Sequence, residues 1–465
     1  MAGRKNRAGN PGPDPSGGPG AGSPTLLIRG GWILSMAPGG FQGQGDILVR
    51  EGRIQEIGRD LPRPPGASLL DASGAAVLPG LVQAHIHLCQ TLFRGLAEEM
   101  ELLPWLQTRI LPLEAAHDEK SIAASARLAL TELLLSGTTA VQTMETVRHT
   151  QVVLEVLEEA GVTAVTGGCL IDQGEGIPPS MVLPAGRALE AQLSLAREWN
   201  GKRSDRVEAA LCPRFALSCS EGLLRECAAA SRDKGLRLHT HAAENKEEIR
   251  RVREITGLSD IAFLDGAGLL GPATSLAHCV HVSPEDRARL RDRGVHVVTC
   301  PSANLKLASG IAPAAEYLDQ GIDLALGADG APCNNRLDPW RETLLLSLLQ
   351  KVLAGPAALP PGKALETATL GGARALGREK EIGTLEKGKR ADLAVVDLEA
   401  PWLGPGGSPE TRLVFAAGPA EVRHLVLGGK PVVRNGEFLL WDPAEAAARA
   451  REELEKLLSR ANLPS

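Results

Sequence analysis

The sequence predicts an α/β fold: a (β/α)₈ TIM-like barrel that carries a small composite β-sandwich domain built from both ends of the chain. Two observations lead to this prediction. About eight short apolar runs alternate with segments of helical spacing over residues 79–383, and this alternation is typical of parallel strands joined by helices. A texture of short strands and turns occurs at both ends, over residues 25–78 and 384–442.

The two ends of the chain are expected to form the composite β domain. Residues 1–24 contain almost no large apolar side chain and are rich in Gly, Pro and Ser, which predicts a disordered tail. Strand texture then begins at Thr25 with TLLIRGGWIL, GDILVREGRIQEIG with its Glu51-Gly52 turn, and SLLDASGAAVLPG. It returns in ADLAVVDL and EVRHLVLGGKPVVRNGEFLL, where Asn435-Gly436 is a hairpin signal. Residues 443–465 are predicted to form a C-terminal helix.

The barrel strands are expected, in order, at AAVLPGLVQAH, TTAVQTM, GVTAVTGGCLI, VEAALCP, LRLHTHAA, TSLAHCV, VHVVTC and DLALGAD. Helix starts lie between them, such as Ser220 before GLLRECAAASRDKG and Ser283-Pro284 before DRARLRDRG. A doubly wound open sheet is the competing fold. That fold predicts a glycine-rich phosphate loop after an early strand, and no early strand is followed by GxGxxG or GxxxxGK[ST].

Composition excludes several classes of protein. The chain has 465 residues, 43% hydrophobic and 23% charged, which is typical of a folded globular protein. Fifty Lys and Arg against 56 Asp and Glu give a net charge of -6 without a basic stripe, so we expect no nucleic-acid partner. The absence of a long apolar stretch and of a secretory signal predicts a cytoplasmic protein that does not bind membranes. The sequence does not distinguish a monomer from a homo-oligomer. Eight cysteines without a CxxC pair indicate neither a disulfide framework nor a thiolate zinc site.

Polar residues at the ends of the predicted barrel strands are the candidates for chemistry, because barrel active sites lie at the carboxyl ends of strands. These strand-end residues are His85 and His87, then His239 and His241, then His278, then Asp329. Residues two apart on a strand point to one face, so His85 and His87 can bind one ion together.

Three imidazoles and one carboxylate suit one divalent metal per chain, zinc first, with Fe²⁺ or Mn²⁺ as alternatives. Any one of these histidines taken alone is better interpreted as a packed core residue than as a ligand. Their joint placement at strand ends, together with Asp329, favours metal binding. His239 is expected to be structural. The remaining histidines are interpreted as packing or surface residues: His117, His149, His281, His296 and His424.

These motifs carry a family resemblance. VLPGLVQAHIHL, HTHAAE, SLAHCVH and LGADGAPCNN resemble the amidohydrolase superfamily, within it the deaminases of methylthioadenosine, S-adenosylhomocysteine and 5′-deoxyadenosine and the related triazine chlorohydrolases. The resemblance runs from about residue 25 to 455. It implies the same barrel with a composite β domain, and a hydrolase that replaces a ring amino group by a keto group and releases ammonia.

The resemblance also implies roles for individual residues. His85, His87, His241 and Asp329 match the metal ligands, Glu244 matches the proton shuttle, and His278 matches the histidine that orients the attacked centre. Asp329 and His278 would also orient a metal-bound hydroxide formed near neutral pH. Binuclear relatives need a carboxylated lysine after strand 4, and VEAALCPRFALS has none, so a mononuclear site is implied.

Substrate recognition is implied less completely. Besides Glu244 and His278, Glu114 in LPLEAA matches a carboxylate that holds ribose hydroxyls in nucleoside-processing members. Gly168 stands where some adenosine-type deaminases carry Arg, and Arg214 stands where they carry His. The chemical group at the 5′ position of the substrate is therefore not predicted. Asn304, Cys333 and Asn334 are candidates for shaping the pocket.

Three hypotheses for the function follow. The first is a metal-dependent deaminase of adenosine-type nucleosides. The second is an aminohydrolase or chlorohydrolase of free purine bases or s-triazines, such as guanine, 8-oxoguanine or a chlorotriazine. Glu114 separates these two, because a free base has no diol to hold. The third, a metal-free structural relative, predicts lost ligands, and every expected ligand is present.

Overall fold

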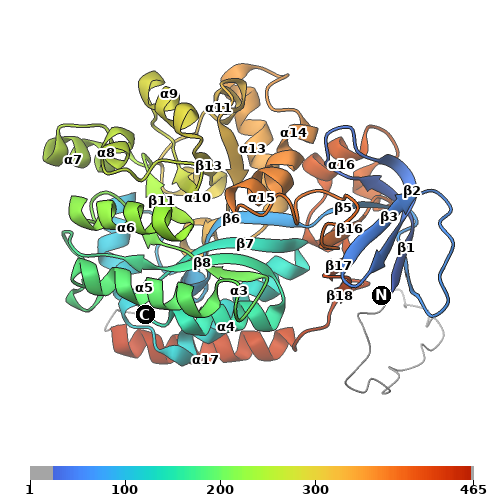
Figure 1. Ribbon diagram of the computed structural model, residues 1–465, viewed down its shortest axis with the longest axis horizontal. Helices are drawn as coiled ribbons and strands as arrows, with labels where there is room; N and C mark the ends of the chain where they lie inside the picture. The colour runs from blue at the N-terminus through green and yellow to red at the C-terminus, as the bar shows by residue number, and fades with distance from the viewer. Residues whose placement is uncertain (1–24, 462–465) are drawn as a thin grey trace, which may run out of the picture.

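The computed structural model describes residues 25–461 and shows a barrel of strands and helices with a twisted sheet against one side (Figure 1). The predicted tail, residues 1–24, and residues 462–465 of the predicted C-terminal helix lie outside the described residues. The TIM-like barrel with an additional β unit, predicted from the sequence, is confirmed. The assignment of separate domains with the stated boundaries stays a prediction.

The side sheet joins strands from both ends of the chain. Its order is β19-β18-β17-β16-β5-β1-β2-β3, with β4 beside β1. The first part supplies β1 (Leu26–Leu34), β2 (Gln42–Arg50), β3 (Arg53–Gly58), β4 (Ser68–Asp71) and β5 (Ala75–Pro79). The last part supplies β16 (Leu393–Asp397), β17 (Val422–Leu427), β18 (Lys430–Arg434) and β19 (Glu437–Phe438). The two parts meet where β16 pairs antiparallel with β5.

The predicted hairpin turns are present in this sheet. Glu51 and Gly52 connect β2 and β3 with φ values of 50° and 76°, and Asn435 and Gly436 connect β18 and β19 with 53° and 77°. Two consecutive residues in the left-handed conformation form the tight turn that matches the twist of paired strands. Asn-Gly predicts such a turn because both residues adopt this conformation readily.

Eight strand positions within residues 25–461 form the barrel. They are β6 (Leu81–His87), β7 (Thr138–Glu145), β8 (Thr163–Leu170), β9 (Val207–Ala209) with β10 (Cys212–Pro213), β11 (Leu238–Ala242), β12 (Thr274–His278), β13 (His296–Thr299), and β14 (Asp323–Leu326) with β15 (Asp329–Gly330). The first, fourth and eighth expected strands are each split in two, and the first half of AAVLPGLVQAH, β5, belongs to the side sheet and not to the barrel. Backbone bonds between Leu211 and both Arg237 and His239 join the fourth position to β11. The barrel closes where β14 pairs with β13 and β15 pairs with β6.

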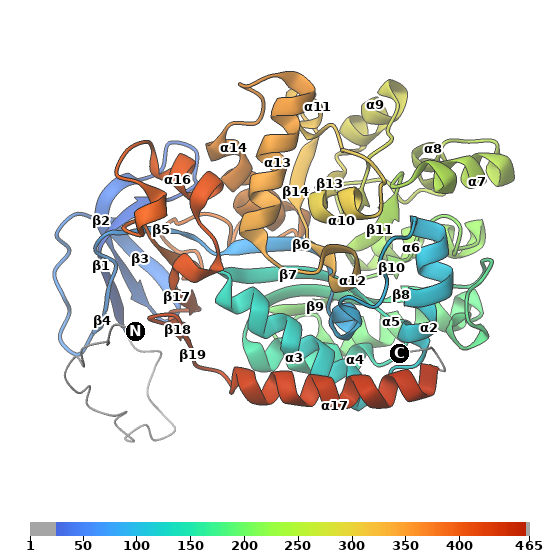
Figure 2. The same cartoon turned by 180° about the vertical axis from the view of Figure 1, so that it is seen from behind.

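Helices cover the outside of the barrel (Figures 1 and 2). The longer ones are α3 (Glu119–Leu135), α4 (Thr150–Ala160), α5 (Ala185–Trp199), α6 (Glu221–Lys234), α7 (Lys246–Thr256), α9 (Pro284–Arg293), α13 (Pro339–Ala354), α16 (Pro409–Ala416) and α17 (Pro443–Ala461). Shorter helices are η1 (Leu88–Phe93), α1 (Leu102–Trp105), η2 (Leu106–Ile110), α2 (Leu111–Ala115), η3 (Pro179–Met181), α8 (Asp260–Gly266), α10 (Pro301–Lys306), α11 (Ala314–Asp319), α12 (Ala331–Asn334), α14 (Pro361–Glu366), η4 (Thr367–Gly371), α15 (Gly372–Ala375), η5 (Pro401–Leu403) and η6 (Pro419–Glu421).

The helix starts expected from the sequence are present. The Ser220 hydroxyl accepts the Leu223 amide at the start of α6, and the Ser283 hydroxyl accepts the Asp286 amide at the start of α9. These bonds satisfy amides that the first turn of a helix leaves without a partner. The long last helix α17 lies along α3 below the barrel (Figure 2).

The side sheet and the barrel are joined covalently and by an ion pair. The chain passes from β5 into β6 at Gly80, where a Cβ atom would lie 2.0 Å from the Thr139 hydroxyl. The Arg206 guanidinium donates two bonds to the Asp392 carboxylate, at 3.0 and 2.9 Å. Arg206 precedes barrel strand β9, and Asp392 precedes β16 of the sheet, so this pair connects the two parts.

Two further observations concern residues 25–461 as a whole. No helix among them combines the length and the apolar character that crossing a membrane requires. All eight cysteines are buried free thiols, as expected from their spacing.

Candidate active site

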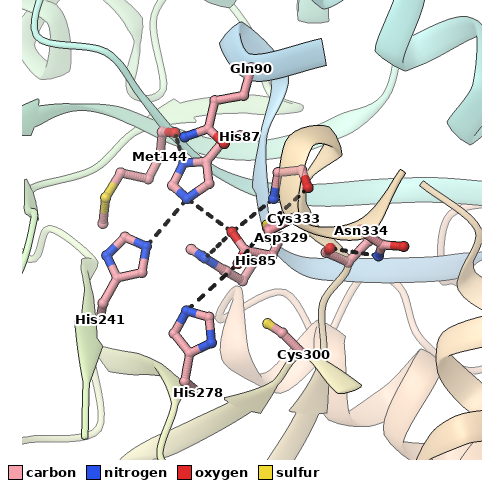
Figure 3. Close-up of polar contacts among 12 residues, drawn as sticks. His85, His87, Gln90, Met144, His241, His278, Cys300, Asp329, Cys333 and Asn334 are labelled. Carbon is pink, nitrogen blue, oxygen red and sulfur yellow. Dashed lines mark hydrogen bonds and ion pairs between the residues drawn. The ribbon is translucent and has the colours of Figure 1, made fainter. Parts of the chain in front are cut away.

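Four predicted ligands converge at the carboxyl ends of the barrel strands (Figure 3). His85 and His87 end β6, His241 lies on β11, and Asp329 begins β15. Their ligand atoms all lie within 4.8 Å of one another. Asp329 pairs in register with Ile86, so its carboxylate lies beside both histidines of β6. Its Oδ1 atom is 3.3 Å from His85 Nε2 and 3.2 Å from His87 Nε2.

Backbone carbonyls fix the tautomers of two of these histidines. His87 Nδ1 is 2.6 Å from the Met144 carbonyl, and His241 Nδ1 is 2.7 Å from the Arg214 carbonyl. A carbonyl only accepts, so each Nδ1 carries the proton, and each neutral ring presents a lone pair at Nε2. The two Nε2 atoms are 3.3 Å apart.

A side-chain relay orients the third histidine. His85 Nδ1 lies 2.7 Å from His239 Nε2, and His239 Nδ1 lies 2.9 Å from the Ser275 hydroxyl. That hydroxyl donates to Gln142 and can therefore accept from His239. His85 then donates through Nδ1, and its Nε2 atom is buried without a hydrogen-bond partner among the described residues. Burial lowers the pKa of His85 to about 4, which keeps this ring neutral.

This donor set fits a metal ion. Three imidazole lone pairs and one carboxylate oxygen face a common centre, and lone pairs at this separation repel unless a cation lies between them. Nitrogen and oxygen donors of this kind suit zinc and other first-row divalent ions. Second ring nitrogens held by carbonyls and side chains are typical of metal-binding histidines.

Local contacts hold Asp329 in an unusual backbone conformation, with φ at 59°. The Gly330 amide donates to Oδ1 at 2.8 Å, and the Cys333 thiol donates to Oδ2 at 3.2 Å. Gly327, just before it, lies so near strand β6 that a Cβ atom would be 2.7 Å from the His85 carbonyl. Cys333 is therefore a hydrogen-bond donor to a predicted ligand, since burial raises the pKa of its thiol well above the usual value.

Glu244 and His278 lie beside the four ligands. His278 Nε2 is 3.4 Å from Glu244 Oε2 and 3.9 Å from Asp329 Oδ2. The His278 ring is held through Nδ1 by Asn304 Oδ1 at 2.8 Å, and the Ser309 hydroxyl donates to Glu244 Oε1 at 3.3 Å. Burial, together with the charge of Asp329, raises the pKa of Glu244 to about 8. The carboxyl thus can hold and release a proton near neutral pH.

Glu114 and Arg214 form a buried ion pair next to this centre. Arg214 donates to both Glu114 oxygens, at 2.8 and 3.2 Å, and the Gln90 side-chain amide donates to Glu114 Oε1 at 2.7 Å. Burial opposes the charge of Glu114, but Arg214 outweighs it and lowers the pKa of this carboxyl below its usual value. Gly168, near the end of β8, donates its backbone amide to Gln192 Oε1 at 3.1 Å and carries no side chain toward the site.

Two cavities lie above the strand ends. The inner one, about 20 Å³, is lined by Arg214, His241, Glu244 and Asp329 and has room for about one water molecule. The outer one, about 400 Å³, is mostly apolar, with Leu103, Ile177, Leu217 and Ile255 among its walls. Leu106 and Phe215 line both cavities.

Several residues around the site were not found from the sequence. Ser309 and Ser275, the latter within the motif SLAHCVH, were given no role, because their contacts depend on chain crossings that local patterns do not encode. Asn334 was a candidate without a role, and it donates to the Ala328 carbonyl and to Glu342. Glu248 had an available signal, since Asn245 and Glu248 have the spacing of a capping box.

Known proteins share this architecture. Residues 76–432 match the amidohydrolase family. The chain is 37% identical over 435 residues to a 5-methylthioadenosine/S-adenosylhomocysteine deaminase of Moorella thermoacetica, covering 93% of this chain and 99% of that protein. It is 36% identical over 431 residues to a 5′-deoxyadenosine deaminase of Methanothermobacter thermautotrophicus, covering 91% and 98%. A solved adenosine deaminase of Xanthomonas campestris with bound zinc has a TM-score of 0.88, 31% identity, and coverage of 93% and 98%.

Proposed function

The chain belongs to the amidohydrolase family, and from this premise we propose that it is a metal-dependent hydrolase that deaminates adenosine-type nucleosides and releases ammonia. The observation that carries the proposal is the convergence of three histidine Nε2 atoms and the Asp329 carboxylate beside Glu244. The names of relatives at 36% and 37% identity over most of the chain support the substrate class.

His85, His87, His241 and Asp329 would hold one divalent ion, with zinc as the first candidate. When bound, the ion would supply the Lewis acidity that makes water a nucleophile near neutral pH. The arrangement supports one ion, because strand β10 and the turn after it contain no lysine that could bridge a second.

Glu244 is the proposed proton shuttle. Its carboxylate accepts the proton of the attacking water and donates it to the ring nitrogen next to the amino-bearing carbon. It then carries the second proton to the amino group, which leaves as ammonia, and a keto group stays on the ring. His278, held by Asn304, and Asp329 orient the water toward that carbon.

Glu114 and Arg214 are the proposed contacts to the remainder of the nucleoside. A carboxylate has about four acceptor sites, and Glu114 already accepts three N–H bonds. One site is left for a ribose hydroxyl, and exchange of the Gln90 bond provides another. The outer cavity, with its apolar walls, suits a substituent such as a methylthio group at the 5′ position.

One observation favours the second function, hydrolysis of a free purine base or triazine. Arg214 lines the inner cavity whereas Glu114 does not, so the guanidinium is the nearer group to a substrate ring. A ring with a carbonyl acceptor, such as guanine, could bind there without a sugar.

The experiment that separates the two functions measures ammonia release from methylthioadenosine, 5′-deoxyadenosine, S-adenosylhomocysteine, adenosine, adenine, guanine and a chlorotriazine. We expect the highest kcat/KM with an adenosine-type nucleoside. Glu114→Gln should lower that kcat/KM by about one to two decades and leave a free base nearly unchanged. A preference of the wild-type protein for guanine or the triazine would establish the second function instead.

A further inference from the structure

Glu244, the proposed proton shuttle, lies in a short turn whose backbone conformation is unfavourable without stabilising contacts. Strand β11 ends at Ala242, and α7 begins at Lys246, so three residues reverse the chain and direct Glu244 into the inner cavity. Ala243 adopts a left-handed backbone with φ at 51°, which is unfavourable for a residue with a side chain. Such conformations persist where surrounding contacts hold them.

Two buried carboxyl groups hold the amides of this turn. The Ala243 amide donates to Asp260 Oδ2 at 2.6 Å, and the Glu244 amide donates to Glu248 Oε2 at 2.9 Å. The Asn245 amide donates to the same Glu248 oxygen at 3.3 Å. Glu248 and Asp260 are each 1% exposed. The first lies on α7 and the second begins α8, so two different helices fix one turn.

The same turn is tied to the loop that carries His278. The Ala243 carbonyl accepts the Val280 and His281 amides, and the Ala242 carbonyl accepts the Cys279 amide at 3.0 Å. His278 and Cys279 are also left-handed, with φ at 74° and 46°. A displacement of Ala243 would therefore reach both Glu244 and His278.

The two buried carboxyl groups accept neighbouring amides of one turn, so their negative charges would repel. Asp260 Oδ1 is buried and has no hydrogen-bond partner among residues 25–461. Glu248 accepts both of its amide bonds through Oε2, and it also lines the inner cavity with Glu244. Burial, with the charges of Asp260 and Glu244, raises the pKa of Glu248 well above its usual value.

We propose that Glu248 and Asp260, which accept the amides of residues 243–245, together hold this turn and so position Glu244 for proton transfer. The proposal rests on the proposed function, because it assigns the pair to the deamination site. Glu248 and Asp260 are positioning residues, because their observed contacts are to the backbone of residues 243–245.

The test compares two substitutions at one position in the metal-loaded protein. Glu248→Gln keeps a carbonyl acceptor for the Glu244 and Asn245 amides. We expect its kcat to stay within about threefold of the wild type. Glu248→Leu removes the acceptor, and we expect kcat to fall by at least tenfold, with KM within about threefold and metal content unchanged. Glu247→Leu, on the exposed side of the same helix turn, is the matched control and should retain wild-type kcat.

Hydrogen exchange of residues 243–245 tests the proposal without any substrate. Glu248→Leu should accelerate exchange of the Glu244 and Asn245 amides at least tenfold, whereas Glu248→Gln should not. If Glu248→Leu does not fold, Asp260→Ala tests the same point through the Ala243 amide. Full kcat and protection in the Leu variant would overturn the proposal.

Equal loss of kcat in the Gln and Leu variants would also overturn it, because Glu248 would then act in proton transfer itself. Failure of the wild-type protein to deaminate any nucleoside, with the exchange pattern as expected, would contradict the proposed function and leave the support of the turn intact.

Discussion

Single buried carboxyl groups hold the backbone at several strand ends of this barrel. Glu145, the last residue of β7, accepts the Leu88 and Cys89 amides directly after His87. Glu342, on α13, accepts the Ser302 amide at 3.0 Å and the Asn334 side-chain amide. Because carboxylate oxygens satisfy loop amides that no strand or helix can pair, these residues let irregular loops stay buried near the site.

The proton shuttle can be tested at the level of one atom. Glu244→Gln keeps the size of the side chain but cannot carry a proton, so kcat should fall by about 10² to 10⁴-fold while metal content is unchanged. Steady-state ammonia release and elemental analysis measure the two quantities. Glu247→Gln is the matched control on the same segment. A Glu244→Gln protein that retains more than about a third of wild-type kcat would remove Glu244 from the mechanism.

Glu342 should make stability depend on pH. Burial raises the pKa of its carboxyl to about 7 in the folded protein from a model-peptide value of 4.5. The unfolded chain therefore loses the proton first, so the folded state loses stability as pH rises from about 4.5 and the full loss is reached above about 7. Glu342→Gln, which has no charge to bury, should gain about 2 kcal/mol in unfolding free energy relative to wild type between pH 5 and pH 8. Urea denaturation of both proteins at pH 5 and pH 8 measures this gain. The same difference in unfolding free energy between variant and wild type at both pH values would contradict a raised pKa of Glu342.

At the scale of residues, the metal ligands could be predicted because strand alternation and strand-end position are visible in the sequence. The contacts of Glu114 could not. Its ion pair with Arg214 joins α2 to the loop after β10, across 100 positions of sequence, and depends on how the barrel brings these loops together.

At the scale of elements, the turn η2 and the segment between β8 and α5 build the outer cavity together. The Gln107 side-chain amide donates to the Glu175 carbonyl at 3.1 Å, and the Arg251 guanidinium lies 2.7 Å from the Glu175 carboxylate. η2 is a π-helical turn, a distortion that often occurs at functional sites. The sequence predicts helical spacing between the barrel strands but not this π-helical turn. One extra residue in a turn leaves the spacing of apolar residues almost unchanged.

Ile177, in the segment after β8, offers a test of the outer cavity. Ile177→Ala removes apolar wall that a 5′ substituent would contact, at about 0.8 kcal/mol for each methylene group lost. We expect kcat/KM for methylthioadenosine to fall about tenfold and that for adenine to change less than threefold. Val352→Ala, at a remote position that is 80% exposed, is the control. Equal losses for both substrates would show that the substituent binds elsewhere.

At the scale of the whole molecule, local patterns predicted the barrel and the shared sheet, since strand and helix periodicity recur along the chain. The connection between them is not local. Asp392 is 186 positions from Arg206, and its carboxylate also accepts the Gly428 amide. Such a contact becomes visible only when the sheet is placed against the barrel.

The Arg206 and Asp392 pair should stabilise the whole chain. Arg206→Met leaves the buried Asp392 carboxylate without its cation, and loss of one partner of a buried pair costs about 3 to 5 kcal/mol. Arg197→Met removes an exposed pair with Glu190 and should cost less than about 1 kcal/mol. Urea denaturation of both variants measures the difference, and similar losses would show that the connection contributes little.

One divalent ion held by His85, His87, His241 and Asp329 is proposed to make the protein a nucleoside deaminase. The most direct measurement adds zinc stepwise to metal-depleted protein and follows ammonia release from methylthioadenosine at each step. The account predicts that activity rises linearly and stops at one ion per chain, and that His87→Ala with His241→Ala abolishes the rise. Activity that continues to two ions per chain, or full metal loading without ammonia from any adenosine-type nucleoside, would contradict it.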